Sequence, residues 1–137
     1  MKYLIISIVF LICGCQRSKQ LEDKKQTVKF KNIDWFCACA RCAEPDTAAK
    51  YQRVGGDRLA DHCVFIEADN PSIRLSDTLG YSGDMIEITG QFYVNKGYAK
   101  DYVKTEEPLA KARVFRYTAY KVIRSNHRTV MDELKSK

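Results

Sequence analysis

Four cysteines constrain the fold of this chain more than any other feature. Cys37, Cys39 and Cys42 fall within six residues, and Cys63 follows twenty-one positions after Cys42. Thiols at this spacing are expected to meet in disulfides or around a metal ion, and both arrangements fix two segments of the fold against each other. Because the whole chain has 137 residues, which is the size of one domain, such a link restrains much of it.

Disulfides are the first interpretation of this cysteine set. An even number of cysteines in an oxidising compartment indicates disulfides, and four cysteines allow three pairings. Cysteines one residue apart on a strand leave the same face in parallel, which disfavours a bond between Cys37 and Cys39. Two pairings remain. One joins Cys37 to Cys63 and Cys39 to Cys42, and the crossed one joins Cys37 to Cys42 and Cys39 to Cys63. A disulfide that closes a loop of roughly 25 residues stabilises a fold by about 3 kcal/mol.

A metal site is the alternative interpretation. Cys-x-Cys directs two thiolates to one side, Cys-x2-Cys forms the knuckle of structural zinc sites, and Cys63 or His62 completes a tetrahedron. Zinc and copper(I) both suit such soft ligands. A third possibility is thiol redox chemistry at Cys39-Ala40-Arg41-Cys42, where the charge of Arg41 favours a thiolate, although the βα setting of thioredoxin-like motifs is missing.

The N-terminal sequence predicts where the protein is located. Met1-Lys2 is followed by an apolar run over residues 3–12, which has the proportions of a secretory signal peptide. A membrane-spanning helix needs about 20 apolar residues, so this run is too short to be an anchor. The next residues, Ile12-Cys13-Gly14-Cys15, resemble the lipobox of bacterial lipoproteins.

That resemblance implies cleavage after Gly14 and attachment of acyl chains such as palmitate to Cys15. The protein is then expected at the cell envelope, bound to the membrane through Cys15. In the lipoprotein pattern an aspartate directly after the lipidated cysteine retains the protein in the inner membrane. Here that position is Gln16, which favours the outer membrane, on its periplasmic or its surface side.

The remaining chain divides by composition. We expect a signal peptide over 1–14, the lipidated cysteine and a flexible tether over 15–27, a β domain over 28–125 and a basic tail over 126–137. The tether has a single aliphatic residue between Gln16 and Thr27 and is dense in charge, which is typical of a hydrated linker.

Alternating apolar residues predict a mainly β domain. The best strand covers residues 86–94, where Ile86, Ile88, Gly90 and Phe92 face one way. Further strands are expected over 28–39 with a bulge near Asn32, over 63–68, over 73–76 and over 112–124 with a bulge near Ala119-Tyr120. Residues 46–61 are expected to form an excursion between strands, with one short helical turn that Gly55-Gly56-Asp57 breaks. No sustained amphipathic helix is present. This pattern predicts a small five-stranded antiparallel barrel, OB-like, or a sandwich.

The segment from Gly83 to Tyr93 (GDMIEITGQFY) resembles the glycine-containing strand of OB-fold barrels. The resemblance implies that Gly83 makes the turn and that Gly90 allows the strand to coil.

Apart from the cysteines, the sequence offers only poor candidates for a catalytic motif. No Ser-His-Asp set has supporting local context, no phosphate-binding glycine loop occurs, and His127 lies in a polar basic tail. The carboxylates Glu67, Asp69 and Asp84 are expected to be solvated turn residues. Five tyrosines with nearby cations suit a stacking surface, but a tyrosine-rich barrel exterior is the simpler interpretation: Tyr93, Tyr98, Tyr102, Tyr117 and Tyr120.

We therefore expect a monomeric binding or structural module stapled by disulfides, without enzyme activity and without a cofactor. Its partners are the membrane, through Cys15, and an envelope protein or small ligand. Nucleic acid is not expected at this location. The alternative is a metal-binding lipoprotein with zinc or copper held by Cys37, Cys39, Cys42 and Cys63, or with His62 in place of one thiolate.

Overall fold

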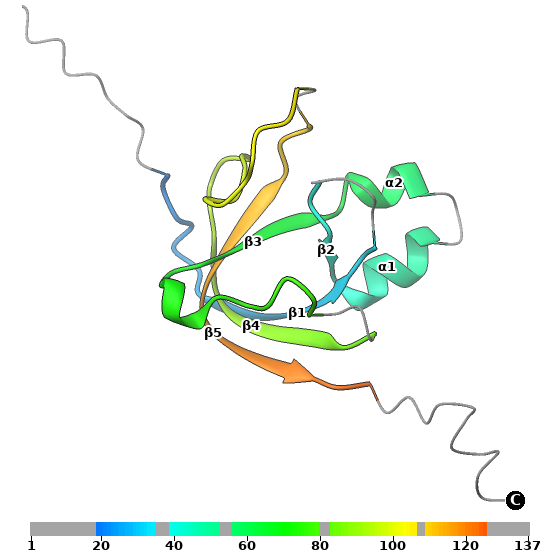
Figure 1. The fold of residues 1–137 in the computed structure, drawn as a ribbon, viewed down its shortest axis with the longest axis horizontal. Coiled ribbons are helices and arrows are strands. Elements are labelled where there is room, and N and C mark those ends of the chain that lie inside the picture. The colour runs from blue at the N-terminus through cyan, green and yellow to red at the C-terminus, as the bar shows by residue number, and fades with distance from the viewer. Residues whose placement is uncertain (1–18, 35–38, 53–55, 80–82, 107–108, 126–137) are drawn as a thin grey trace, which may run out of the picture.

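Five strands close into a small barrel in the computed structural model, which describes residues 19–34, 39–52, 56–79, 83–106 and 109–125 (Figure 1). The strand order around the barrel is β1-β2-β3-β5-β4. Their bounds are Gln26–Asn32 for β1, Cys42–Ala43 for β2, Val64–Ala68 for β3, Met85–Phe92 for β4 and Arg113–Ile123 for β5. The predicted mainly β, five-stranded, OB-like barrel is confirmed.

One strand pair runs parallel, so the expectation of a purely antiparallel barrel is wrong. β3 pairs with β5 in parallel from Val64 opposite Arg113 to Ala68 opposite Tyr117, and the other pairs are antiparallel. The chain leaves β3, crosses to β4 beside β1, and returns as β5 between β3 and β4. The alternation of apolar and polar residues predicts which side chains are buried, but not which strands are neighbours. It therefore does not predict that β3 and β5 run parallel.

β4 follows its predicted pattern closely. Ile86, Ile88, Gly90 and Phe92 are all buried, and their neighbours along the strand are half-buried. The pairing with β5 shifts register between Thr89 and Gly90, which is the irregularity expected in this pair of strands. The predicted turn at Gly83 is confirmed, because this residue adopts φ 79°. Gly90 lies directly against the backbone of β5.

β1 is shorter than predicted. It ends at Asn32, and the N–H of Ile33 donates a hydrogen bond to the Arg41 carbonyl at 2.6 Å. The second half of the strand predicted over 28–39 is therefore wrong where the structure describes it, and residues 35–38 lie outside the described residues. Ile33 breaks the alternation of apolar residues that runs along β1 because its side chain packs in the apolar cluster outside the barrel. A bulge is not the cause.

Two helices and one turn of 3-10 helix accompany the barrel. α1 (Pro45–Gln52) follows β2 and was expected, with Pro45 at its start, where proline costs no hydrogen bond. α2 (Gly56–Ala60) was not expected, because Gly56 predicted a break. The two helices lie beside each other next to β2 (Figure 1), and η1 (Pro71–Ile73) follows β3. Among the described residues, no helix is long and apolar enough to cross a membrane. Residues 73–76 form no strand, because Ile73 belongs to η1 and the chain after it is irregular.

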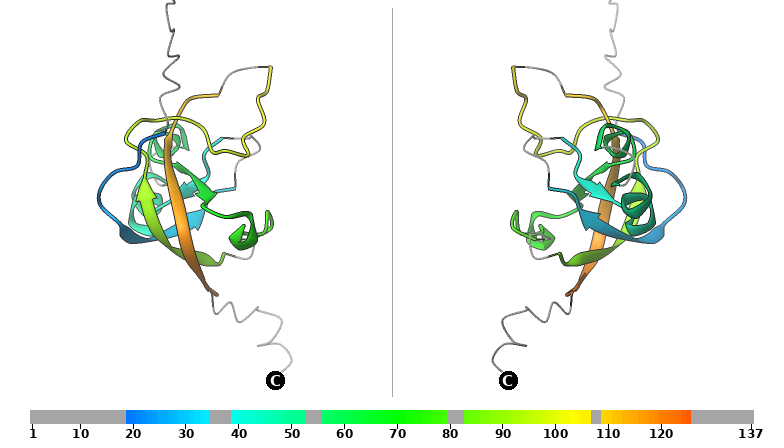
Figure 2. Two further views of the ribbon diagram at one scale, coloured as in Figure 1. Left: turned by 90° about the vertical axis from the view of Figure 1, so that its left-hand side faces the viewer. Right: turned by 90° about the vertical axis from the view of Figure 1, so that its right-hand side faces the viewer.

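Apolar side chains form two clusters. The inner cluster fills the barrel with Phe30, Cys42, Val64, Ile86, Ile88, Phe92, Phe115 and Tyr117. The outer cluster lies under the helices and under the connection between β4 and β5, and contains Ile33, Ala40, Ala43, Ala48, Leu59, Cys63, Phe65, Tyr93, Ala99 and Val114. Figure 2 shows that the described part of this connection, in yellow, extends beyond the strands.

The described part of the predicted tether packs on the barrel. Glu22 N–H donates to the Phe92 carbonyl at 2.8 Å, and Val94 N–H donates to the Gln20 carbonyl at 2.9 Å. Leu21 forms a bridge with Tyr93. Residues 19–22 therefore pack with the folded domain, although they lie before the predicted boundary at 28. The predicted signal peptide over 1–14, the lipidation site Cys15 and the tail over 126–137 lie outside the described residues.

Candidate functional site

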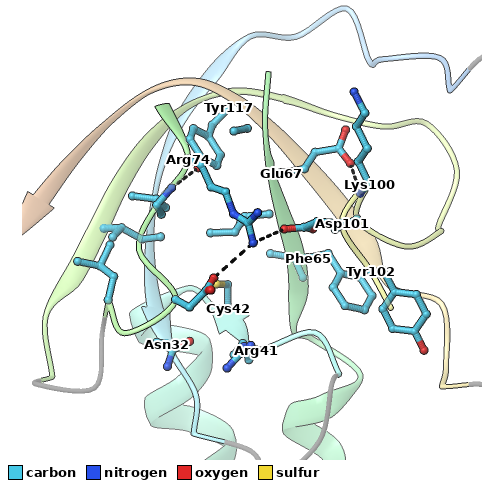
Figure 3. A pocket seen from close by; sticks show the side chains of 18 of the residues that line it. Asn32, Arg41, Cys42, Phe65, Glu67, Arg74, Lys100, Asp101, Tyr102 and Tyr117 are labelled. Atoms are coloured by element: carbon cyan, nitrogen blue, oxygen red, sulfur yellow. Dashed lines mark hydrogen bonds and ion pairs between the residues drawn. The ribbon is translucent and has the colours of Figure 1, made fainter. Parts of the chain in front are cut away.

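A pocket of about 690 Å³ runs along β3 (Figure 3). Every residue of β3, from Val64 to Ala68, contributes to its wall. The other walls come from the segment after η1, from the end of the turn between β1 and β2, and from residues 99–103 of the β4–β5 connection. Its volume is in the range of sites that hold a small molecule or a short peptide segment.

The shortness of β2 creates the pocket. β2 contains only Cys42 and Ala43, and only Cys42 pairs with β3, opposite Val64. Before Cys42 the chain turns toward β1, held by the hydrogen bond between Ile33 and Arg41. From Phe65 onward β3 therefore has β5 on one side and the pocket on the other.

The floor of the pocket is apolar. Leu75, Leu79, Ile86 and Tyr117 line it, and all four pack with the inner cluster. The Tyr117 hydroxyl accepts a hydrogen bond from Leu75 N–H at 3.0 Å and donates to the Ile73 carbonyl at 3.2 Å, which holds the segment after η1 against the barrel. Burial raises the pKa of Tyr117 above its ordinary value, which favours the protonated hydroxyl that donates this hydrogen bond.

Charged groups form the rim. Arg74 lies across the pocket and forms ion pairs with Asp77 at 3.6 Å and with Asp101 at 3.4 Å (Figure 3). All three side chains are more than half exposed, and ion pairs this exposed stabilise by less than about 1 kcal/mol. Arg74 therefore spans the mouth without closing it firmly.

Glu67 is buried on the opposite face of β3 from the barrel interior. It accepts hydrogen bonds from the Tyr93 hydroxyl and from Lys100 N–H at 2.8 Å, and Lys19 lies 3.6 Å away. Burial, and next the hydrogen bond to Glu67, raise the pKa of Tyr93 to about 12. The carboxylate thus joins β3, β4, the β4–β5 connection and the N-terminal segment.

The expectation that three carboxylates are solvated turn residues is therefore wrong for Glu67, which is 7% exposed. Asp69 forms an ion pair with Arg116, and Asp84 accepts a hydrogen bond from Ser125 N–H. All three carboxylates line the pocket, but each already has a partner.

Arg41 and Asn32 lie at the end of the pocket next to Cys42 (Figure 3). Arg41 is half-buried, and no described residue forms an ion pair with its guanidinium. This end of the pocket therefore offers a cation and an amide to a ligand.

Among the described residues, Cys42 and Cys63 take part in none of the predicted disulfides. Cys42 belongs to the inner cluster and Cys63 to the outer cluster, because Cys42 pairs with Val64 and consecutive side chains alternate between faces. Both are thiols, and every disulfide of the two predicted pairings needs one of them. The structure therefore contains neither pairing. The sulfur of Cys39 is disulfide-bonded, and Cys37 lies outside the described residues.

The thiol of Cys42 has the wrong protonation for redox chemistry. Burial raises its pKa to about 12, the nearby Cys63 acts in the same direction, and the charge of Arg41 opposes both without outweighing them. The thiolate predicted at this motif is therefore disfavoured at Cys42.

The described residues do not assemble the predicted metal ligands. Within the described ranges, no group of three or more histidine, cysteine, aspartate or glutamate side chains could hold a metal ion. His62 is exposed and stacks on Tyr51, with ring centroids 4.3 Å apart. The complete four-cysteine set includes Cys37 and so extends outside the described residues.

The five tyrosines do not form one surface. Tyr93 and Tyr117 are buried, Tyr120 is exposed on β5, and Tyr98 stacks on Tyr102 with centroids 4.4 Å apart. The predicted tyrosine-rich exterior is therefore wrong for Tyr93 and Tyr117, whose rings pack in the two clusters.

The pocket was not predicted from the sequence, because the cysteines and His62 indicated a site made of other residues. The available signal was the interval between Arg41 and Pro45, which leaves room for only a very short strand before a helix. Comparison of the chain with protein-family models, with curated proteins and with solved structures finds no match.

Proposed function

We propose that this protein is a lipid-anchored binding module of the cell envelope, and that its ligand occupies the pocket along β3. The pocket itself carries the proposal, because it combines an apolar floor with a charged rim and a half-buried guanidinium that has no ion-pair partner among the described residues. Sites that bind ligands typically combine these features.

The anchor is the second part of the proposal. The lipobox-like sequence ending at Cys15 supports lipidation, and the barrel begins only a few residues later, since Gln20 already bonds to Val94. Changing Cys15→Ser should move the protein from the membrane fraction to the soluble fraction, and intact mass should show the loss of acyl chains. An unchanged membrane fraction and mass would rule out the anchor.

Binding in the pocket can be tested with anilinonaphthalene sulfonate, a fluorescent probe with an apolar body and one negative charge. The chain from Gln16 onward contains the complete barrel and should enhance the fluorescence of this probe. Ala68→Trp, which fills the pocket, should reduce the enhancement at least tenfold, and so should Ser76→Trp at an exposed lining position. Ala119→Trp on exposed β5 is the matched control and should bind normally.

The proposal fails if the probe gives no enhancement with the folded wild-type chain, or if all three tryptophan variants bind it equally. Far-UV circular dichroism of each variant establishes that the barrel is folded.

A further inference from the structure

Among the residues that the structure describes, the edge of β3 that faces the pocket has no backbone partner beyond its first residue. β3 pairs with β5 from Val64 to Ala68, whereas on the other side only Val64 pairs, opposite Cys42. No hydrogen bond from a described residue reaches the backbone of Phe65 to Ala68 on that side. A strand with one neighbour leaves the N–H and C=O of alternate residues unpaired, and these groups can pair with an added strand.

The pocket has room for such a strand because it follows β3 for its whole length. Four residues of extended chain span about 13 Å. Side chains of an added strand that lie on the Ile66 side would meet the apolar floor with Leu75 and Tyr117. Those on the Phe65 side would meet the rim near Asp101. The pocket therefore suits a peptide in which apolar and polar residues alternate.

The direction of the added strand follows from β2. β2 runs antiparallel to β3, and the pocket continues its line beyond the point where the chain turns away at Arg41. An antiparallel peptide in this position ends near Val64, at the end of the pocket that Arg41 and Asn32 line (Figure 3). A guanidinium with no ion pair among the described residues is a good partner for a carboxylate, which it binds through two parallel hydrogen bonds.

We infer that the pocket binds the C-terminal segment of an extended peptide, which adds to β3 as an antiparallel strand and places its terminal carboxylate on Arg41. This inference rests on the proposed function and names the chemical class of its ligand. Backbone pairing supplies affinity in this mode of recognition, and the alternate side chains supply selectivity.

The inference can be tested with the acetylated hexapeptide Thr-Lys-Thr-Val-Thr-Val and the chain from Gln16 onward. The free acid should bind at least tenfold more tightly than its C-terminal amide. Arg41→Gln should weaken the free acid to the level of the amide and leave the amide unchanged, because the two changes remove the same contact. Arg58→Gln, an exposed arginine in α2 that does not line the pocket, is the matched control and should behave as wild type.

Backbone pairing is tested with N-methylated peptides. Methylation of one alternate set of peptide nitrogens should abolish binding, and methylation of the other set should have little effect, since only alternate residues of an added strand face β3. Bound peptide should also slow amide hydrogen exchange in residues 65–68.

Equal affinity of both N-methylated sets and the parent peptide would overturn strand addition, and equal affinity of acid and amide would overturn the role of Arg41. If no hexapeptide binds while the fluorescent probe still binds in an Ala68-dependent manner, the peptide inference is wrong and the proposed binding function stands. If neither binds, both are wrong.

Discussion

At the residue scale, two stacked tyrosines differ in one hydrogen bond. The Tyr98 hydroxyl donates to the Leu109 carbonyl, whereas the buried Tyr102 hydroxyl has no hydrogen-bond partner among the described residues. A buried hydroxyl without a partner costs about 1 to 3 kcal/mol, so its removal is not destabilising.

Replacing the two tyrosines by phenylalanine should therefore have opposite effects. We expect Tyr102→Phe to leave the free energy of unfolding unchanged or to raise it by up to about 1 kcal/mol, and Tyr98→Phe to lower it by about 1 kcal/mol. Urea denaturation of both variants measures this. A clear loss of stability in Tyr102→Phe would show that its hydroxyl has a partner.

Tyr93 makes stability depend on alkaline pH. Its pKa rises from 10.0 to about 12 in the folded protein, so the unfolded chain loses this proton first. The contribution of Tyr93 to stability is complete below pH 10 and is lost as the pH rises from there to about 12, by at most about 1.4 kcal/mol per pH unit. Tyr93→Phe removes this contribution.

We therefore expect the stability difference between wild type and Tyr93→Phe to shrink as the pH rises from 10.0 to about 12, the window set by these two pKa values. At neutral pH the variant should be less stable by about 1 to 3 kcal/mol, because Glu67 loses a buried donor. A difference that stays constant over the alkaline range would contradict the assignment. Urea denaturation at each pH is the measurement.

At the element scale, the pairing of β4 with β5 depends on one glycine. A Cβ atom at Gly90 would lie 2.0 Å from the Arg116 carbonyl oxygen and 2.7 Å from the Tyr117 Cα. These are backbone atoms of β5, so the contact can be relieved only by moving a strand. The same glycine allows the close approach at the register shift.

Gly90→Ala should lower the free energy of unfolding by about 3 kcal/mol or more, or prevent folding. Gly97→Ala is the matched control, because nothing lies within 4 Å of its added Cβ, and it should change stability by less than about 1 kcal/mol. Thermal unfolding of the two variants distinguishes them. Similar stabilities would show that β5 can move away at low cost.

At the scale of the whole molecule, the barrel is closed unevenly. β4 pairs with β5 along its whole length and with β1 from Met85 to Gly90, whereas β2 joins β3 through the single pair Cys42 and Val64. We therefore expect the junction between β2 and β3, which has the fewest backbone pairs, to open locally before the whole barrel unfolds.

Amide hydrogen exchange should therefore be at least tenfold faster for Cys42 and Ala43 in β2 than for Ile88 and Thr89 in β4. Residue-resolved exchange measured by nuclear magnetic resonance tests this expectation. Equal protection in the two strands would mean that the barrel opens only by global unfolding, and would make the junction between β2 and β3 as stable as the rest.

Much of the barrel was predictable because strand patterns are local. The burial pattern of β4, the turn at Gly83 and the helix after Pro45 depend on neighbours a few residues away. The candidate cysteines were also identifiable as residues, although their partners were not. Pairing depends on which face each side chain takes, and Cys42 and Cys63 take opposite faces.

The sequence by itself determined the mainly β class, the boundaries of β3, β4 and β5 to within one or two residues, and the resemblance to a lipoprotein at Cys15. Only the tertiary structure decided the parallel pairing of β3 with β5, the burial of Glu67 and the pocket beside β3. The reason is physical. Side-chain periodicity reports how each strand divides its own faces, whereas strand direction, unpaired edges and cavities arise from segments far apart in the chain.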